Sequence, residues 1–364
     1  SSETLVIDRS GSPGGYLLYT AAPGKQAVID VDNARDFNIE VKGSHVILRG
    51  LTLRGARKDA IRLAKTGTVT DVVIEDNDIS GWGQRDASGP FGAPFQAAIR
   101  VDSNSGVSRL IIQRNRIHHP RFDSNSWCER RSGEADPSCS THPDGPHGIL
   151  LTDSGGHHVI RYNTLESDDA HYFTDGIGGG TFGYEGFPTR DSDVYGNYIE
   201  RCWDNPIEAE GGNRNVRIWG NYLDRSYSPI AITPVSLGPL YIWRNVVDRT
   251  RKGPPEVTGN SDQDPRGRFL KAGEGSRGGG RVYVYHNTIY QRPPSDGSQK
   301  SLGASTGIIT TASDGNAYNM IVRNNILHVV DADETSIQDD ADGTNGRRND
   351  FDHDLFNGRL YSPL

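Results

Sequence analysis

The chain has few sulfur-containing residues and no long apolar segment. Its 364 residues include one methionine and three cysteines, and it has no run of the roughly 18 apolar residues that a membrane span requires. It also lacks a sustained heptad pattern, so we expect little helix. With a formal net charge of −8, it lacks the excess of Lys and Arg that drives phosphate binding, which argues against a nucleic-acid partner.

The three cysteines are informative despite their small number. Cys128 and Cys139 lie eleven residues apart in the polar segment WCERRSGEADPSCS, which a disulfide would close. Such a bond favours an oxidising compartment. The first residues, SSETLVIDRSGSPGG, contain no basic and apolar leader and enter strand-like sequence at once. We therefore expect a secreted, mature chain without its signal peptide. Cys202 is predicted to be unpaired and buried.

What the chain has in abundance is a repeat. An asparagine stands between a short apolar strand and another aliphatic residue eight times, at Asn77, Asn115, Asn163, Asn197, Asn221, Asn245, Asn287 and Asn324. Successive intervals are 38, 48, 34, 24, 24, 42 and 37 residues, so the shortest unit recurs with insertions. The preceding residues are Val, Ile and Tyr in strand-like alternation. This pattern predicts a right-handed parallel β-helix in which inward Asn side chains form a ladder and satisfy buried backbone groups.

The repeat predicts a single all-β domain over residues 1–364. The 44 glycines suit many tight turns. Gly50 in VILRGLTLRG occupies the asparagine position of an earlier coil, which makes about nine to ten coils in total. We assign residues 46–330 to the coils, 1–45 to an N-terminal capping region and 331–364 to a C-terminal tail or cap.

Long insertions between coils are expected to form the walls of a groove on one side of the β-helix. They carry Trp, Tyr, Phe, Arg and Asp, and such loops on a rigid scaffold are where binding normally occurs. The four insertions are 82–95, 120–146, 181–193 and 250–267.

Columns of stacked residues matter more than local motifs, because equivalent positions of successive coils lie about 4.8 Å apart. The predicted inward anchor column is Ile61, Ile99, Ile149, Ile177, Ile207, Ile230, Leu270 and Ile308. Beside it, the segment GIGGG (176–180) would form a bare floor that lets a flat ring approach. Acidic and amide residues converge there, and because like charges repel, a metal ion or a shared proton should neutralise them. These residues are Asp175, Asp204, Asn205, Glu208 and Glu210.

Two enzymatic chemistries fit this cluster, and a non-catalytic glycan-binding β-helix is a third interpretation. In the first, Ca²⁺ grips a uronate carboxylate, and a base, Lys271 or His147, removes the C5 proton before β-elimination. Its calcium ligands would be Asp175, Asp204, Asn205 and Glu208. In the second, one protonated and one ionised carboxylate act as a glycosidase pair, drawn from Glu208, Glu210 and Asp175. The expected substrate-binding side chains are Arg100, Asp102, Arg62 and Trp203.

The whole chain resembles secreted bacterial right-handed parallel β-helix proteins of the pectate-lyase-like superfamily. Three segments, TDGIGGG (174–180), CWDNPIEAEGG (202–212) and GRFLKAGEG (267–275), look like the calcium- and base-bearing segments of polysaccharide lyase family 9. This resemblance implies that Lys271 is the base and that Asp175, Asp204, Asn205 and Glu208 hold calcium.

The match to that family is incomplete. Asn205 stands where the family has an acid, Ile207 where it has an aromatic residue, and Lys271 follows Phe-Leu rather than Phe. An extra coil also separates Glu208 from Lys271. The Glu-x-Glu strand resembles the calcium-holding pair of chondroitinase B-type lyases.

The histidines of THPDGPHGI (141–149) are only loosely similar to an element of the mannuronan epimerases. Histidines in such a Pro/Gly loop are more often exposed turn residues, although His147 stays among the candidate bases. The sequence therefore favours a secreted, calcium-assisted lyase that cleaves a uronate-containing polysaccharide, with a glycoside hydrolase as the alternative.

Overall fold

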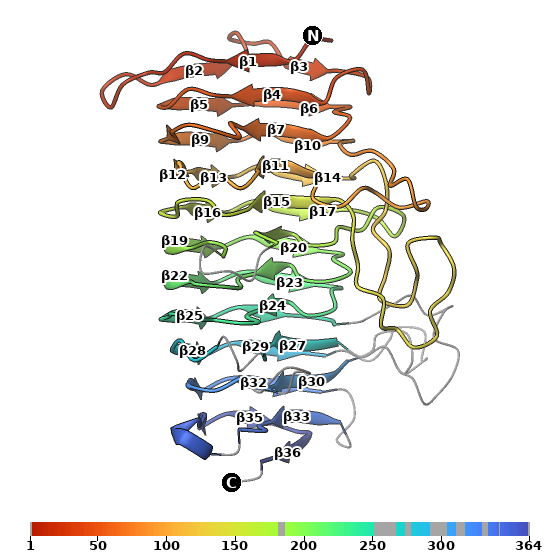
Figure 1. The fold of residues 1–364 in the computed structure, drawn as a ribbon, viewed down its shortest axis with the longest axis vertical. Coiled ribbons are helices and arrows are strands. Elements are labelled where there is room, and N and C mark those ends of the chain that lie inside the picture. The colour runs from red at the N-terminus through yellow and green to blue at the C-terminus, as the bar shows by residue number, and fades with distance from the viewer. Residues whose placement is uncertain are drawn as a thin grey trace.

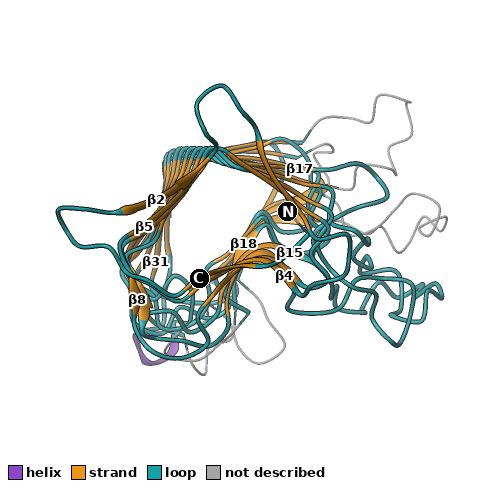
Figure 2. Ribbon diagram, turned by 90° about the horizontal axis from the view of Figure 1, so that it is seen from above, coloured by secondary structure: helices purple, strands orange, loops and turns teal. Residues whose placement is uncertain are grey.

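The structure is a computed structural model, and it describes residues 2–180, 186–250, 267–273, 278–291, 304–310, 317–329, 334–341 and 343–362. The chain winds through three long sheets, and each coil adds one strand to each of them (Figure 1). Seen from above, the three sheets surround the core (Figure 2). Pairing between successive coils is parallel throughout the three sheets, as in β11 with β15 and β22 with β25. The predicted all-β parallel β-helix is confirmed.

The strands are short and recur in a fixed order of sheets. The first sheet consists of β1 (Leu5–Ile7), β4 (Phe37–Val41), β7 (Asp59–Leu63), β11 (Ala97–Val101), β15 (His147–Leu151), β18 (Ile177–Gly178), β21 (Ile207–Glu208), β24 (Ile230–Ala231), β27 (Gly267–Lys271), β30 (Ala304–Ile309), β33 (Thr335–Gln338) and β36 (Arg359–Tyr361). The second consists of β2 (Leu17–Thr20), β5 (Val46–Arg49), β9 (Val72–Glu75), β13 (Ile111–Gln113), β16 (Val159–Arg161), β19 (Arg190–Tyr195), β22 (Arg214–Trp219), β25 (Leu240–Trp243), β28 (Val282–Tyr285), β31 (Met320–Arg323) and β34 (Asp350–Asp352). The third consists of β3 (Ala27–Asp30), β6 (Leu51–Arg54), β10 (Asp78–Ser80), β14 (Arg116–His118), β17 (Thr164–Glu166), β20 (Tyr198–Glu200), β23 (Tyr222–Asp224), β26 (Val246–Val247), β29 (Thr288–Tyr290), β32 (Ile326–His328) and β35 (Leu355–Phe356). A further pair is formed by β8 (Val69–Thr70) and β12 (Val107–Ser108), and a 3-10 turn, η1, spans Thr344–Gly346.

The predicted anchor column is confirmed by the strand register of the first sheet. Each anchor pairs with the anchor of the next coil, from Ile61 with Ile99 to Leu270 with Ile308. All eight anchors are fully buried in one continuous hydrophobic core. Because side chains alternate across a strand, the residue after each anchor is directed to the outer face. That outer column contains Arg62, Arg100, Leu150, Gly178, Glu208, Ala231 and Lys271.

The asparagine ladder lies in the turns between the second and third sheets. Asn221 is typical, because its Oδ1 accepts the backbone N–H and the Nδ2 of Asn197 at 3.0 Å each. Its own Nδ2 donates to Val194 O and to Asn245 Oδ1. The ladder therefore satisfies buried backbone groups in coil after coil, as predicted.

Two ladder positions differ by one residue from the prediction. Asn287 donates to Asn325 and not to Asn324, which has a left-handed backbone with φ of 57°. The turn residue before the ladder position has this conformation throughout the ladder, and Gly50, with φ of 65°, is such a turn residue. Leu51 follows it and donates its N–H to Asn77. The segment IVRNNI contains two adjacent asparagines, and the second of them, Asn325, is the ladder residue.

The number of coils is larger than predicted. The first sheet has twelve strands, against our estimate of about nine to ten coils. Residues 1–45 contribute β1 to β4, and residues 331–364 contribute β33 to β36. These end segments pair in register with their neighbours, as Leu5 does with Ile39. Both ends of the chain therefore extend the β-helix. Among the described residues, no helix is long and apolar enough to cross a membrane.

The insertions occur in the strand order at both edges of the first sheet. Segments 82–95, 120–146 and 250–267 each connect a strand of the third sheet to the next strand of the first. Segment 181–193 instead follows β18, at the opposite edge of the first sheet, and its last four residues belong to β19. The predicted single side is thus wrong for this insertion. Residues 181–185 and 251–266 lie outside the described residues.

The two described insertions pack against each other where they leave the β-helix (Figure 1). Gly92 donates its N–H to Asp123 O at 2.9 Å, and Arg131 pairs with Asp86 at 2.6 Å. Cys128 and Cys139 form the predicted disulfide within the second insertion, and Cys202 is buried and unpaired as predicted. Together these contacts give the loop at 120–146 a defined position beside the first sheet.

Candidate functional site

The predicted acidic residues come together on the first sheet. Asp175 precedes β18, Asp204 precedes β21, Glu208 ends β21 and Glu210 follows it. Lys271 ends β27, two strands further along the sheet. Its Nζ reaches to 3.7 Å from both Asp204 Oδ2 and Glu210 Oε1. The four acids are buried, so one ammonium group lies among four carboxyl groups that are largely removed from water.

Glu208 is held by the backbone of the glycine segment. Its Oε2 accepts the N–H of Gly180 at 2.8 Å and the N–H of Gly179 at 3.3 Å. Burial and the neighbouring charge of Asp175 raise the pKa of Glu208 to about 7, even though Lys271 opposes this rise. Because Oε2 accepts two N–H groups, the proton of the neutral acid belongs on Oε1. Glu208 is therefore a proton donor near neutral pH.

Asp204 has the opposite character. Burial would raise its pKa, but the charge of Lys271 and the contact with His142 lower the pKa below its usual value. His142 Nε2 lies 3.1 Å from Asp204 Oδ2. His142 keeps 59% of its side chain exposed. Its partial desolvation opposes protonation, but the hydrogen bond and charge of Asp204 outweigh that effect and raise the pKa of His142 to about 9. Asp204 is thus an ionised carboxylate between two cations.

Glu210 is the most deeply buried acid of the cluster, at 1% exposure. Burial raises its pKa well above the usual value, and the charge of Lys271 offsets this only in part. Its Oε1 accepts the N–H of Thr233 at 3.4 Å. Burial therefore favours the neutral form of Glu210, and the pKa of Asp204 is lowered instead, so Asp204 is the main counter-ion of Lys271.

A histidine and an aspartate form a second pair at the edge of the cluster. His147 begins β15, and its Nδ1 lies 3.2 Å from Asp175 Oδ2. The other oxygen of Asp175 accepts the backbone N–H of Asn205 at 2.9 Å. His147 is only 4% exposed, and the ring of Phe95 stacks against it at 6.3 Å between centroids. His147 therefore lies at the edge of the acidic cluster, against Asp175.

Several buried polar atoms of this region have no hydrogen-bond partner within the described part of the chain. Buried polar groups are nearly always paired, so each such atom calls for a partner that the chain does not supply. Their convergence is what a site for water or a polyhydroxylated ligand presents. The atoms are Asp204 Oδ1, Asn205 Oδ1, Glu210 Oε2, Ser228 Oγ and His147 Nε2.

The space beside the glycine segment 176–180 is occupied by other side chains of the protein. A Cβ on Gly178 would lie 2.7 Å from Glu208 Oε2, and one on Gly179 would lie 2.2 Å from Phe187 Cβ. A Cβ on Gly180 would lie 3.3 Å from the ring of Phe95. The prediction of a bare floor for a sugar ring is therefore wrong, because these glycines make room for the acid and for two phenylalanines.

The predicted arginines of the substrate site are paired with acids of their own coil and of the adjacent coil. Arg62 contacts Asp59 at 2.8 Å and Asp102 at 2.5 Å. Arg100 lies 3.1 Å from Asp102 and 4.0 Å from Asp59. These four residues form a compact charged group on β7, β11 and the turn after β11, and their charges are largely satisfied within it.

Trp203 is not positioned to touch a substrate. It is only 4% exposed, and its ring stacks on that of Tyr172 with 4.0 Å between centroids. Its position after Cys202 places it in the packed turn between β20 and β21. The expected sugar contact therefore does not fit this side chain.

The described residues do not fit the predicted calcium ion. Calcium takes six to eight oxygen ligands, but among the described residues no group of three or more His, Cys, Asp or Glu side chains is arranged to hold a metal. Of the predicted ligands, Asp175 and Glu208 accept backbone N–H groups, whereas Asp204 Oδ1 and Asn205 Oδ1 have no hydrogen-bond partner among the described residues. Lys271 already places a positive charge at the centre of the cluster, where it opposes a bound cation.

His142 and Phe95 are the site residues that the sequence analysis missed. His142 was expected to be an exposed turn residue, and it does remain partly exposed while it contacts Asp204. Phe95 was noticed only as part of an insertion. The sequence offers one signal for His142, because it lies in a Pro/Gly segment five residues before β15. Its contact with Asp204 could not be predicted, because the repeat does not determine the path of the 27-residue insertion that carries it.

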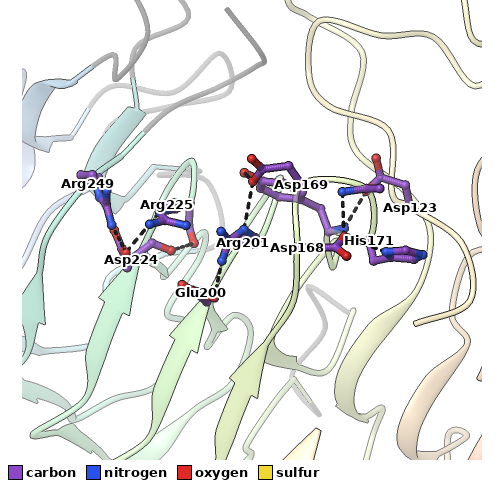
Figure 3. A network of polar contacts seen from close by, with 12 residues as sticks. Asp123, Asp168, Asp169, His171, Glu200, Arg201, Asp224, Arg225 and Arg249 are labelled. Carbon is purple, nitrogen blue, oxygen red and sulfur yellow. Dashed lines mark hydrogen bonds and ion pairs between the residues drawn. The ribbon is translucent and has the colours of Figure 1, made fainter. Parts of the chain in front are cut away.

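Two further histidines, His158 and His171, lie outside the cluster. His158 is buried, with Nε2 2.9 Å from Ser154 Oγ and Nδ1 accepting the N–H of Leu110, so it has a structural role in the core. His171 pairs with Asp168 at 2.7 Å. It belongs to a row of polar contacts along the turns that follow the third sheet (Figure 3).

That row is a network of matched charges. Arg249 donates to Asp224 at 2.7 Å, and Arg201 bridges Asp169 and Glu200 (Figure 3). At its end, Asp123 accepts the backbone N–H of Tyr172 at 2.6 Å. The pairing of acids with arginines here contrasts with the excess of acids around Lys271.

Comparisons with known proteins give only distant matches. No protein-family model matches the sequence, and no curated protein is significantly similar to it. Among solved structures, an alginate lyase from Paenibacillus sp. str. FPU-7 is 12% identical with a TM-score of 0.42, and the match covers 99% of this chain and 88% of that one. DFA-IIIase from Arthrobacter chlorophenolicus A6 is 11% identical with a TM-score of 0.45, over 92% of this chain and 71% of that one. At this distance neither activity is transferred to the present chain.

Proposed function

We propose that the protein is a carbohydrate-active enzyme that hydrolyses glycosidic bonds, with Glu208 as the proton donor and Asp204 as the ionised carboxylate. The observation that carries the proposal is that one buried cluster holds Glu208, whose Oε2 accepts two backbone N–H groups, and Asp204, which Lys271 and His142 contact. Their pKa values are displaced in opposite directions. Environments that push neighbouring carboxyl groups apart in pKa are typical of an acid and base pair. Glycosidases commonly use two such groups on either side of the scissile bond.

The proposed steps follow from the atoms that are already positioned. Glu208 transfers the proton on Oε1 to the glycosidic oxygen as the bond from that oxygen to the anomeric carbon breaks. Asp204 Oδ1, the oxygen without a described partner, either takes a proton from the attacking water or attacks the anomeric carbon itself. In the second case water then cleaves the bond between Asp204 and the sugar, and ionised Glu208 takes the proton of that water. Lys271 and His142 contact the other oxygen of Asp204, which keeps the carboxylate ionised and oriented.

Lysine-based β-elimination has weaker support. A catalytic base needs a free electron pair, but the surrounding carboxylates raise the pKa of Lys271 above its usual range in spite of burial. His147 is the alternative base, since its Nε2 has no partner among the described residues and Asp175 contacts its Nδ1. A lyase using His147 is therefore the second candidate. The proposal of an extracellular enzyme is supported by the disulfide between Cys128 and Cys139.

Product analysis tests the proposal directly. The protein is incubated with xylan, mannan, laminarin, polygalacturonate and alginate, and the products are followed by mass spectrometry and by absorbance of unsaturated uronates. Hydrolysis predicts new reducing ends and products that have gained one water. Unsaturated products would overturn the hydrolase in favour of the lyase. If wild-type protein forms no product from any of these polymers, the assignment of a glycan-cleaving enzyme fails for this panel.

A further inference from the structure

The side chain of Phe95 lies beside the acidic cluster and faces solvent. It is 47% exposed, although a phenylalanine gains most by burial. Its ring is within 15° of parallel to His147, with 6.3 Å between centroids. The ring also borders the position of Gly180, whose N–H holds Glu208 Oε2 at 2.8 Å. Phe95 therefore contacts Gly180, which in turn binds the proposed proton donor Glu208, and its ring stacks against that of His147.

Phe95 has a left-handed backbone conformation although it lies outside the repeated turn of the β-helix. Its φ is 57°, in the left-handed region that non-glycine residues adopt only at a cost of about 1 kcal/mol or more. Several other large residues with positive φ, such as Arg114 and Arg244, occupy the repeated turn before a ladder asparagine. Tyr162, with φ of 55°, is one of them and is 53% exposed. Phe95 belongs to no such turn.

Two hydrogen bonds of the following residue, Gln96, fix the chain next to Phe95. Gln96 accepts the backbone N–H of His147 on its carbonyl at 2.7 Å. The buried Gln96 side chain accepts the N–H of Gln84 at 2.8 Å across the loop. The loop is thus fixed at the start of β15, and the exposed ring is presented in one orientation. Strain together with an exposed apolar ring at a candidate active site indicates a binding role.

We propose that Phe95 is a specificity-determining residue whose outer ring face stacks on the apolar C–H face of a pyranose unit bound next to Glu208. This inference rests on the proposed function. One ring face is turned to His147, and the exposed part remains for the ligand. Aromatic rings supply a flat contact with little loss of conformational entropy.

Four variants test the proposal with whichever polymer of the panel is cleaved. Phe95→Ala should raise KM about tenfold with kcat changed less than threefold, and Phe95→Trp should keep KM within threefold. Phe95→Gly should lose affinity like Phe95→Ala without lowering Tm, because glycine adopts positive φ freely. Tyr162→Ala is the matched control, since it removes an equally exposed aromatic ring from a left-handed position, and KM should not change.

An unchanged KM for Phe95→Ala, or an equal rise for Tyr162→Ala, would overturn the inference. So would a fall in Tm for Phe95→Gly, which would show that the ring packs for stability. If wild-type protein cleaves no polymer, affinity electrophoresis in gels containing the same polysaccharides decides separately. Retardation lost in Phe95→Ala would uphold the inference while the proposed hydrolysis fails, and the absence of any retardation would overturn both.

Discussion

Two groups of acidic residues lie close together in this β-helix, and they are organised in opposite ways. Along the turns after the third sheet, carboxylates are matched with arginines, as Asp224 is with Arg249 and Arg225 (Figure 3). On the first sheet, four buried carboxyl groups share Lys271 as their central cation, with His142 and His147 at the edges. The first arrangement neutralises its charges except at Asp123, where burial and neighbouring acids raise the pKa to about 8, whereas in the second both Glu208 and Glu210 have raised pKa values.

This difference indicates which of the two groups of acidic residues stabilises the fold. A buried acid that is fully paired recovers much of its desolvation cost, so the network is consistent with a purely structural role. Glu208 and Glu210 instead have raised pKa values because burial and neighbouring acids disfavour their charge. A cluster kept in that state destabilises the fold, and such costs are characteristic of active sites. Variants of the two groups of acidic residues test this contrast.

The largest expected effect is on turnover. Glu208→Gln removes the proton donor, and kcat should fall by about a thousandfold or more, because positioned acids typically contribute factors of that order. Asp224→Asn is the control from the matched network and should retain wild-type kcat. The comparison uses initial rates on the cleaved polysaccharide. Comparable losses for both variants would mean that the acidic cluster has no special role.

The second expected effect is on stability, and its sign differs between the two groups. The pKa of Glu208 is raised on folding, so the ionised form costs stability as pH rises through its usual pKa to about 7, and the cost is complete above that value. Glu208→Gln should therefore gain about 1 kcal/mol at pH 8.5, since Gln can still accept the N–H of Gly180.

In the matched network the opposite change is expected. Arg249→Met leaves Asp224, which is 3% exposed, with Arg225 as its remaining basic contact, so the variant should lose about 3 kcal/mol. Urea unfolding of both variants measures the two shifts. Destabilisation by Glu208→Gln would contradict the view that the cluster carries an energetic cost.

The third effect is a displacement of the pH profile. With Glu208 as the acid, kcat/KM should fall tenfold per pH unit above about pH 7, where the proton is lost. Lys271 lowers the pKa of Glu208, so Lys271→Met should move this limb to higher pH. Lys65→Met, which removes an exposed cation paired with Asp102, should not. Complete loss of activity at every pH in Lys271→Met would instead support a lysine base.

The features of the fold and of the site that could be predicted from the sequence are those that recur once per coil. The anchor column from Ile61 to Ile308 was correct at every position, because a buried residue must recur once per coil in the same register. The same register brought Asp175 and Glu208 into adjacent coils. Where two asparagines adjoin in IVRNNI, periodicity could not choose between Asn324 and Asn325, since only the turn geometry separates them.

The features that were missed depend on contacts outside the repeat. His142 meets Asp204, and Phe95 covers His147, only because two insertions fold back over the first sheet. The neutralisation of Arg100 by Asp102 and Asp59 was not foreseen because each residue was considered as a separate column. The pKa values, which decide between lysine and carboxyl chemistry, depend on burial that no single segment reveals.

The smallest expected effect is that of a chelator. If protons and Lys271 balance the acidic cluster, EDTA should leave kcat/KM unchanged, and added Ca²⁺ should not increase it. The physical reason is repulsion, because a cation about 4 Å from an ammonium group is disfavoured by about 4 kcal/mol per unit charge at an effective dielectric constant near 20. In Lys271→Met that repulsion is absent and Asp204 loses its counter-ion, so this variant should bind Ca²⁺ more tightly than wild type in calorimetry. Inactivation of wild type by EDTA with recovery on adding Ca²⁺ would restore the predicted calcium site and make the acidic cluster a metal centre rather than a proton-sharing one.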